Sequence, residues 1–286
     1  MVMKKGFWII LCMFFIPLVT FAGNMKLHYD RPAEYFEEAL VIGNGTMGAT
    51  LYGGVKKDKI SFNDITLWTG EPESENSSPD AFNVIPEIRA LLDNEDYEGA
   101  DKAQYKVQGH YSENYQPLGT LTIEYLDDTA GISDYHRWLD IGNATARTQY
   151  LKDGKLFTSD YFASAPDSVI VIRLKSENKE GIHALLSFDS PLPHSSQVAD
   201  NEISVEGYAA YHSFPVYYKA EDKHRYDPER GIHFKTLVRV LSVDGSVKNR
   251  YSDSRIEIDG STEVLILIAN VTSFNGFDKD PVKEGR

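Results

Sequence analysis

Short stretches in which apolar and polar residues alternate run through most of the chain. In Leu121–Tyr125 the leucine, isoleucine and tyrosine fall on one face, which is typical of a strand with one buried side. Val169–Leu174 and Val264–Val271 are apolar on both faces, so both are predicted to lie in the middle of a sheet and to be covered on both sides. About a dozen such stretches follow Lys26. The pattern predicts a mostly β protein, a large two-sheet antiparallel β-sandwich (a supersandwich).

The stretch 83–109 has helical periodicity instead. Apolar residues recur at helical spacing over 84–92 and again, after a short break, over 97–107, and Gly109 ends the run. Two short helices inserted between strands are therefore predicted. A second irregular stretch, Pro191–Gly231, is crowded with tyrosine and histidine and is predicted to form long loops around one or two strands.

Three Asp-Gly pairs separate strand-like runs: Asp153-Gly154, Asp244-Gly245 and Asp259-Gly260. This dipeptide favours the two-residue turns of β-hairpins, because both of its positions tolerate a positive φ. Each pair therefore predicts a tight hairpin.

Residues Gly43–Gly48 read GNGTMG, which is the glycine spacing of a dinucleotide-binding loop. That loop needs a helix after the glycines, because the helix N-terminus holds the pyrophosphate. Here Gly53-Gly54 would break a helix, and Lys59–Phe62 alternates like a strand. The motif therefore predicts a strand-to-strand turn with a glycine at positive φ, and no nucleotide cofactor.

The first 22 residues have the order of a secretory signal: Lys4 and Lys5, then an apolar run from Phe7 to Phe21, then the small Ala22. The run is shorter than the roughly 20 residues of a membrane-spanning helix, so a cleaved leader is favoured over a stable membrane anchor. We expect a signal peptide over 1–22, one domain over 23–286, and export to the periplasm or the extracellular space.

Composition limits the kinds of partner and ligand that the mature chain could bind. Cys12, the single cysteine, lies in the predicted leader, so the mature chain would have no disulfide and no cysteine metal ligand. The formal charge is −14, and it becomes −16 when the two lysines of the leader are removed. Such a chain repels nucleic acid and anionic membranes but not neutral sugars. The histidines show no metal-binding spacing, so neither a metal nor a cofactor is predicted.

Several motifs occur in a characteristic order. The stretch Pro32–Gly70 contains the GNG turn and ends in the signature N-x-x-T-L-W-[ST]-G, and the stretches 115–125, 135–150 and 162–174 follow. With these motifs nearly the whole predicted mature chain resembles glycoside hydrolase family 95, the inverting exo-α-L-fucosidases. One departure is Glu71, which stands where a glycine usually follows the signature.

The resemblance implies an N-terminal β-sandwich that family members continue into a helical (α/α)6 catalytic barrel. The acid and the water-activating residues lie in that barrel, so no catalytic residue carries over to this chain. The implied role is the non-catalytic N-terminal domain of a secreted enzyme that removes terminal α-L-fucosyl, or α-L-galactosyl, residues from glycans by inversion. Its partners would be a fucosylated glycan and the barrel. A different class of function, a free-standing carbohydrate-binding module, stays open.

Four residues are candidates for a substrate mouth or a domain interface. Trp68 and Thr69 end the signature, and Tyr211 and His212 belong to the aromatic-rich stretch 208–226. An aromatic face suits a sugar or an apolar interface equally, and packing in the core is the competing interpretation for Trp68.

Overall fold

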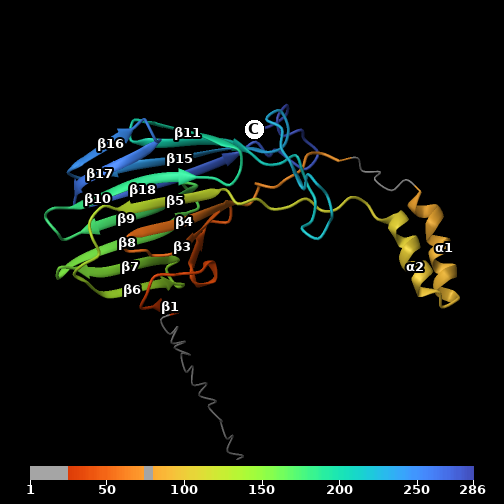
Figure 1. Ribbon diagram of the computed structural model, residues 1–286, viewed down its shortest axis with the longest axis horizontal. Coiled ribbons are helices and arrows are strands. Elements are labelled where there is room, and N and C mark those ends of the chain that lie inside the picture. Colours follow the sequence, from red (N-terminus) through yellow and green to blue (C-terminus); the bar gives the residue numbers. More distant parts are fainter. Residues whose placement is uncertain (1–24, 74–79) are drawn as a thin grey trace, which may run out of the picture.

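The computed structural model describes residues 25–73 and 80–286, so the predicted signal peptide and Cys12 lie outside the described residues. Two large antiparallel sheets are stacked face to face (Figure 1), as the sequence predicted. The nine-stranded sheet has the order β1 (Lys26–Tyr29), β6 (Ile132–Asp140), β7 (Thr145–Lys152), β8 (Lys155–Ser164), β9 (Val169–Ser176), β18 (Glu263–Thr272), β15 (His233–Ser242), β12 (Glu202–Tyr208), β11 (His194–Ala199). The seven-stranded sheet has the order β16 (Ser246–Arg250), β17 (Arg255–Ser261), β10 (Ile182–Asp189), β5 (Gly119–Tyr125), β4 (Lys57–Asp64), β3 (Met47–Leu51), β2 (Leu40–Gly43).

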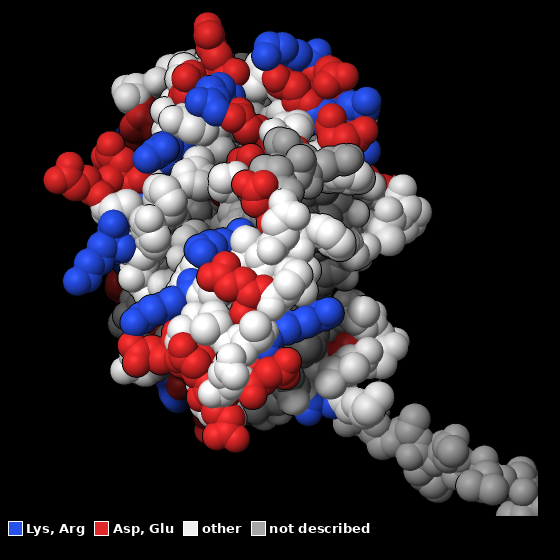
Figure 2. Space-filling view, turned by 90° about the vertical axis from the view of Figure 1, so that its right-hand side faces the viewer, with Lys and Arg blue, Asp and Glu red and all other residues white. Residues whose placement is uncertain are grey.

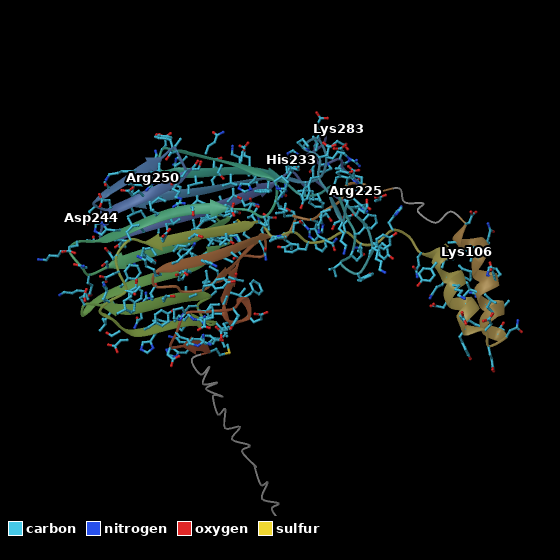
Figure 3. All side chains as sticks on the ribbon, viewed as in Figure 1. Lys106, Arg225, His233, Asp244, Arg250 and Lys283 are labelled. Atoms are coloured by element: carbon cyan, nitrogen blue, oxygen red, sulfur yellow. The ribbon has the colours of Figure 1, made fainter. Side chains whose placement is uncertain are left out.

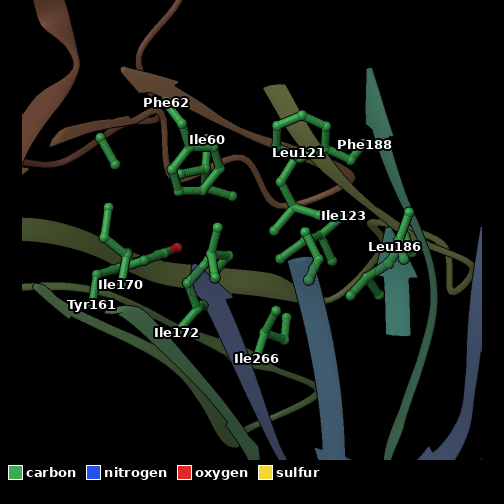
Figure 4. Close-up of a cluster of buried hydrophobic side chains, with 14 of the residues drawn as sticks. Ile60, Phe62, Leu121, Ile123, Tyr161, Ile170, Ile172, Leu186, Phe188 and Ile266 are labelled. Atoms are coloured by element: carbon green, nitrogen blue, oxygen red, sulfur yellow. The ribbon is translucent and has the colours of Figure 1, made fainter. Parts of the chain in front are cut away.

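The core lies between the two sheets. In β5 burial alternates along the strand, so the face predicted from Leu121–Tyr125 is the buried one. Figure 4 shows these side chains meeting those of the nine-stranded sheet, and Phe62 packs on Phe188 with ring centroids 6.0 Å apart. Burying a large apolar side chain contributes about 1.5–3 kcal/mol, so this layer is the main stabilising term.

Strands β9 and β18 lie side by side in the middle of the nine-stranded sheet, as predicted. Their inward side chains, such as Ile172 and Ile266, are fully buried. The expected cover on the outer face is only partial, because Leu265 and Leu267 there are half-buried. Neighbouring side chains of the same sheet shield that face without a second layer over it.

The two predicted helices are present between β4 and β5: α1 (Ala81–Asp93) and α2 (Tyr97–Gln104), followed by the short η2 (Tyr105–Val107). Asp96 begins α2 by accepting a hydrogen bond from the Gly99 N–H at 2.9 Å. We call 81–107 the helical hairpin. It projects away from the sandwich (Figure 1), and its buried residues are Ala100 and Ala103.

Only one of the three Asp-Gly pairs forms the tight hairpin that the sequence predicted. Asp153-Gly154 turns β7 into β8, with both residues at positive φ and Lys152 paired with Lys155. Asp244-Gly245 instead carries the chain from β15 in one sheet to β16 in the other. Asp259-Gly260 lies inside β17, where the pairing with β10 is irregular. A positive φ serves a crossover or a bulge as well as a hairpin, so the dipeptide alone does not distinguish them.

The GNGTMG motif is a hairpin between β2 and β3, as predicted, in which Gly43 pairs with Gly48. The Asn44 side-chain oxygen accepts hydrogen bonds from the Thr46 and Met47 N–H groups at 3.0 and 2.8 Å. Gly45 has a φ of 92°. The glycine spacing therefore serves a turn.

We expect Gly45→Val to lower the free energy of unfolding by about 1 kcal/mol or more. No atom lies within 4 Å of an added Cβ at this position, so backbone strain alone is the cause. Urea unfolding measures the change, and Gly142→Ala is the matched control. Gly142 also lies in a turn but has no positive φ. An equally small effect of both substitutions would contradict the expectation.

Strand β4 carries a buried carboxylate near each end of its inward face, Asp58 and Asp64. Asp58 is 1% exposed and accepts hydrogen bonds from the Gly54 N–H at 2.9 Å and the Tyr161 hydroxyl of β8 at 2.8 Å. Burial raises the pKa of Asp58 to about 6, against the hydrogen bonds that favour its anion.

One buried arginine adds to the contacts that hold the N-terminal segment 25–39 on the nine-stranded sheet, where β1 already pairs with β6. Arg137 of β6 is 1% exposed. Its guanidinium donates to the carbonyl oxygens of Arg31 and Glu38, both at 2.8 Å, and lies 4.2 Å from the Tyr29 ring centroid. Burial lowers the pKa of Arg137. This side chain thus fixes the part of the segment that follows β1.

Candidate functional site

Loops from both sheets converge at one end of the sandwich, where Figure 3 labels Arg225, His233 and Lys283. They surround a hollow of about 350 Å³. Apolar and acidic side chains line it, among them Ile65, Trp68, Glu71, Glu113, Ile232, Phe274, Phe277 and Pro281. Figure 2 views the molecule from this side, with the helical hairpin in front, and shows acidic and basic residues intermixed with uncharged surface.

Trp68 lies on the wall of the hollow and is 43% exposed. Its indole N–H donates to the Ile65 carbonyl oxygen at 3.0 Å, and its ring meets Tyr115 edge-on, with centroids 5.4 Å apart. Burial raises the pKa of Tyr115. These contacts fix the indole while one side of it stays open to solvent, so Trp68 is not a core residue.

Glu113 joins two of the predicted residues. Its carboxylate accepts hydrogen bonds from the Thr69 hydroxyl, from His212 Nδ1 at 2.7 Å and from the Ser213 N–H at 3.0 Å. Thr69 is 3% exposed, and both Thr69 and Glu113 line the hollow, so this network forms part of its wall. The three acceptor contacts lock the loop after β4 against the loop that contains β13 (His212–Ser213).

Tyr211 takes part in a neighbouring contact. The Arg230 guanidinium lies 3.6 Å from the centroid of its ring and also forms an ion pair with Glu71, its Nε donating at 3.0 Å. The Glu71 hydrogen bond raises the pKa of Arg230. In the same region the Gly70 N–H donates to the Ala210 carbonyl oxygen at 3.0 Å. All four predicted residues thus meet at this end of the sandwich.

A buried polar network fixes the base of the Trp68 loop. Asp64 accepts from the Thr66 N–H at 2.9 Å and from the Asn270 amide of β18 at 2.8 Å. Thr236 of β15 in turn donates to Asn270 at 2.7 Å. A carboxylate on one sheet is therefore hydrogen-bonded to the other sheet directly below the site.

Glu71, Glu113, Asp64 and Arg230 were not among the predicted site residues. Asp64 had a usable signal, since it continues the inward alternation of Asp58, Ile60 and Phe62 along β4. Glu71 and Arg230 are 159 residues apart in the chain, so no local pattern links them. Glu113 likewise lies in a segment without periodicity.

The two acids that line the hollow are already engaged, Glu71 with Arg230 and Glu113 with its three donors. Over 25–73 and 80–286, no three His, Cys, Asp or Glu side chains are grouped as a metal ion would need. In the part of the chain that the structure describes, no helix is long and apolar enough to cross a membrane. The two acids of the hollow thus hold the surrounding loops together.

Three curated proteins are similar to the chain. Alpha-L-fucosidase 2 of Arabidopsis thaliana is 28% identical over 259 residues, which are 88% of this chain and 31% of that protein. Two proteins named probable alpha-fucosidase A, from Aspergillus oryzae and Aspergillus niger, are 23% and 28% identical over 84% and 92% of this chain and 32% of each relative. The chain therefore spans about a third of the length of these relatives.

The sequence model of one family, described as glycosyl hydrolase family 65, N-terminal domain, matches residues 27–276. This match covers nearly all of both sheets and the loops of the hollow. The relatives agree with it and confirm the resemblance to α-L-fucosidases that the motifs carry. The chain belongs to the glycosyl hydrolase family 65 N-terminal domain family.

Proposed function

We propose that the chain is the non-catalytic N-terminal domain of an α-L-fucosidase-type glycoside hydrolase. Its motifs indicate glycoside hydrolase family 95. The complete enzyme would remove terminal α-L-fucosyl, or α-L-galactosyl, residues from glycans by inversion. The observation that carries this proposal is the similarity to three proteins named as α-fucosidases over most of this chain and about a third of theirs.

The partner we propose for the loop end is the catalytic region of the same enzyme, a helical barrel by resemblance. The hollow beside Trp68 supports this, because it is lined by exposed apolar side chains such as Phe277, which is 85% exposed. Covering such side chains with another surface lowers the free energy. The buried network from Asp64 to Asn270 would hold the loop in a fixed position for that contact.

We also propose that the protein is exported. The basic, apolar and small residues of 1–22 support this, in the order of a secretory signal.

The chain alone is expected not to hydrolyse an aryl α-L-fucoside. Its two site acids are held by Arg230 and by the Glu113 donors, and hydrolysis with inversion needs an acid and a base on opposite sides of the sugar. Release of the aryl group measures turnover, with the Arabidopsis alpha-L-fucosidase 2 as the positive control. Turnover by the purified chain that disappears in Glu113→Gln would refute the non-catalytic role.

A further inference from the structure

A second feature of the loop end is a group of aromatic rings on its outer surface. We call Tyr111, Phe214, Tyr217 and Tyr218 the tyrosine platform. Tyr217 is 75% exposed, Tyr111 44% and Tyr218 39%. None of these three rings lines the hollow beside Trp68, so the platform is a separate surface.

The rings hold one another in place. Tyr111 meets Tyr217 and Tyr218 edge-on, with centroids 6.3 and 5.4 Å apart. Tyr218 stacks on Phe214 at 4.7 Å, with an interplanar angle of 13°. Phe214 in turn contacts His212 edge-on at 4.5 Å. The platform is therefore tied to the Glu113 network through His212.

The backbone beneath the platform is fixed as well. The Tyr218 N–H donates to the Pro215 carbonyl oxygen at 2.9 Å, which closes a tight turn at the tip of the loop. Lys223 Nζ donates to the Val216 carbonyl oxygen at 2.6 Å, and the Phe214 N–H donates to the Lys223 carbonyl oxygen at 2.9 Å. Rings that are already ordered lose little conformational entropy when they bind a ligand.

An open hollow of about 480 Å³ lies along the same loop tip, lined by 216–221 and Lys223. It combines exposed ring surface with polar groups, the Tyr217 and Tyr218 side chains, Lys219 and Glu221. Apolar faces with a few hydrogen-bonding groups beside them suit a sugar, whose C–H faces and hydroxyls need both.

We propose that the tyrosine platform binds a neutral glycan by stacking its pyranose rings on Tyr217 and Tyr111. The formal charge of −14 disfavours an anionic ligand. Lys219, Glu221 and Lys223 line the hollow at the same loop tip, and charged side chains are depleted in the core of protein interfaces, so this surface suits a sugar better than a protein partner.

The proposal rests on the proposed function only for the choice of a fucosylated sugar. The test uses the 286-residue chain and titrates it with 2′-fucosyllactose, and with lactose as the sugar that lacks fucose. Binding is followed by isothermal calorimetry and by the NMR signals of the sugar. We expect a Kd on the order of 1 mM for 2′-fucosyllactose.

Tyr217→Ala and Tyr111→Ala are each expected to weaken binding about fivefold, which corresponds to one partly buried ring face. Tyr251→Ala is the matched control. Tyr251 is 74% exposed and follows Arg250, which Figure 3 places at the opposite end of the sandwich from Arg225. Its substitution is expected to leave binding unchanged.

Absence of binding by the native chain at about 50 mM sugar would overturn the proposal. Binding that ignores both tyrosine substitutions would overturn it too. The chain could instead form a dimer that Tyr217→Ala dissociates, with no sugar bound at any concentration. That result would replace the glycan proposal with a contact between two copies of the chain. Equal binding of lactose would support glycan binding at the platform and show that the platform does not recognise the fucosyl group. None of these outcomes depends on hydrolysis, so they are separate from the test of the non-catalytic role.

Discussion

Replacing Arg137 by methionine is expected to lower the free energy of unfolding by about 3 kcal/mol, because two carbonyl oxygens lose their donor at once. The Arg31 and Glu38 carbonyls both accept from this guanidinium at 2.8 Å, and the Tyr29 ring lies against it. A methionine fills the space but donates no hydrogen bond. Residues 30–39 should then separate from β6, while β1 stays paired with it over Lys26–Tyr29.

Urea unfolding measures the loss of stability, and limited trypsin digestion locates it through earlier cleavage at Arg31. The matched control is Arg147→Met on the neighbouring strand β7. Arg147 pairs with Asp160 at the surface and its side chain is 41% exposed, so its loss should cost about 1 kcal/mol or less. Equal losses for the two variants would show that burial of Arg137 does not fix the segment.

The Asp58→Asn variant is expected to gain stability relative to the native protein as the pH rises from 4 to 7, by about 2 kcal/mol. The pKa of Asp58 is about 6 in the folded protein and 3.8 for a free side chain. Between these values the folded state keeps a proton that the unfolded chain has lost. The contribution of native Asp58 is therefore complete below pH 3.8 and is lost as the pH rises through about 6.

Asparagine keeps an acceptor for the Gly54 N–H and carries no charge, so it escapes this loss. Chemical unfolding at pH 4, 5, 6 and 7 measures the difference between variant and native protein. Asp140→Asn is the control, because a hydrogen bond from the Asn143 side chain holds the pKa of Asp140 below its usual range. The stability difference between Asp140→Asn and the native protein should change little from pH 4 to pH 7, and that small change should have the opposite sign. A difference for Asp58→Asn that stays constant with pH would contradict the raised pKa.

The parts of the fold that the sequence predicted are those in which burial repeats locally. Leu121, Ile123 and Tyr125 alternate because β5 has one face in the core, and α1 and α2 repeat every three to four residues because they pack on each other. Asp244-Gly245 and Asp259-Gly260 were misassigned because the turn preference of this dipeptide is local. The sheet to which the chain returns is set by contacts far away in the sequence.

The candidate site shows the same division. Trp68 and Thr69 could be selected because a motif contains them, and Tyr211 and His212 because aromatic residues cluster there. Glu113 lies at the centre of the network but has no pattern around it, and its donors are 44 and 99 residues away. Only the folded chain brings these groups together.

The place of β18 also bears on the order of folding during synthesis. This strand follows all the other strands that the structure describes, yet it lies between β9 and β15 in the middle of the nine-stranded sheet. Until residues 263–272 leave the ribosome, the sheet consists of two halves that expose unpaired edges, and exposed edges pair readily with other chains. The nascent sandwich is therefore prone to aggregate until β18 closes the sheet.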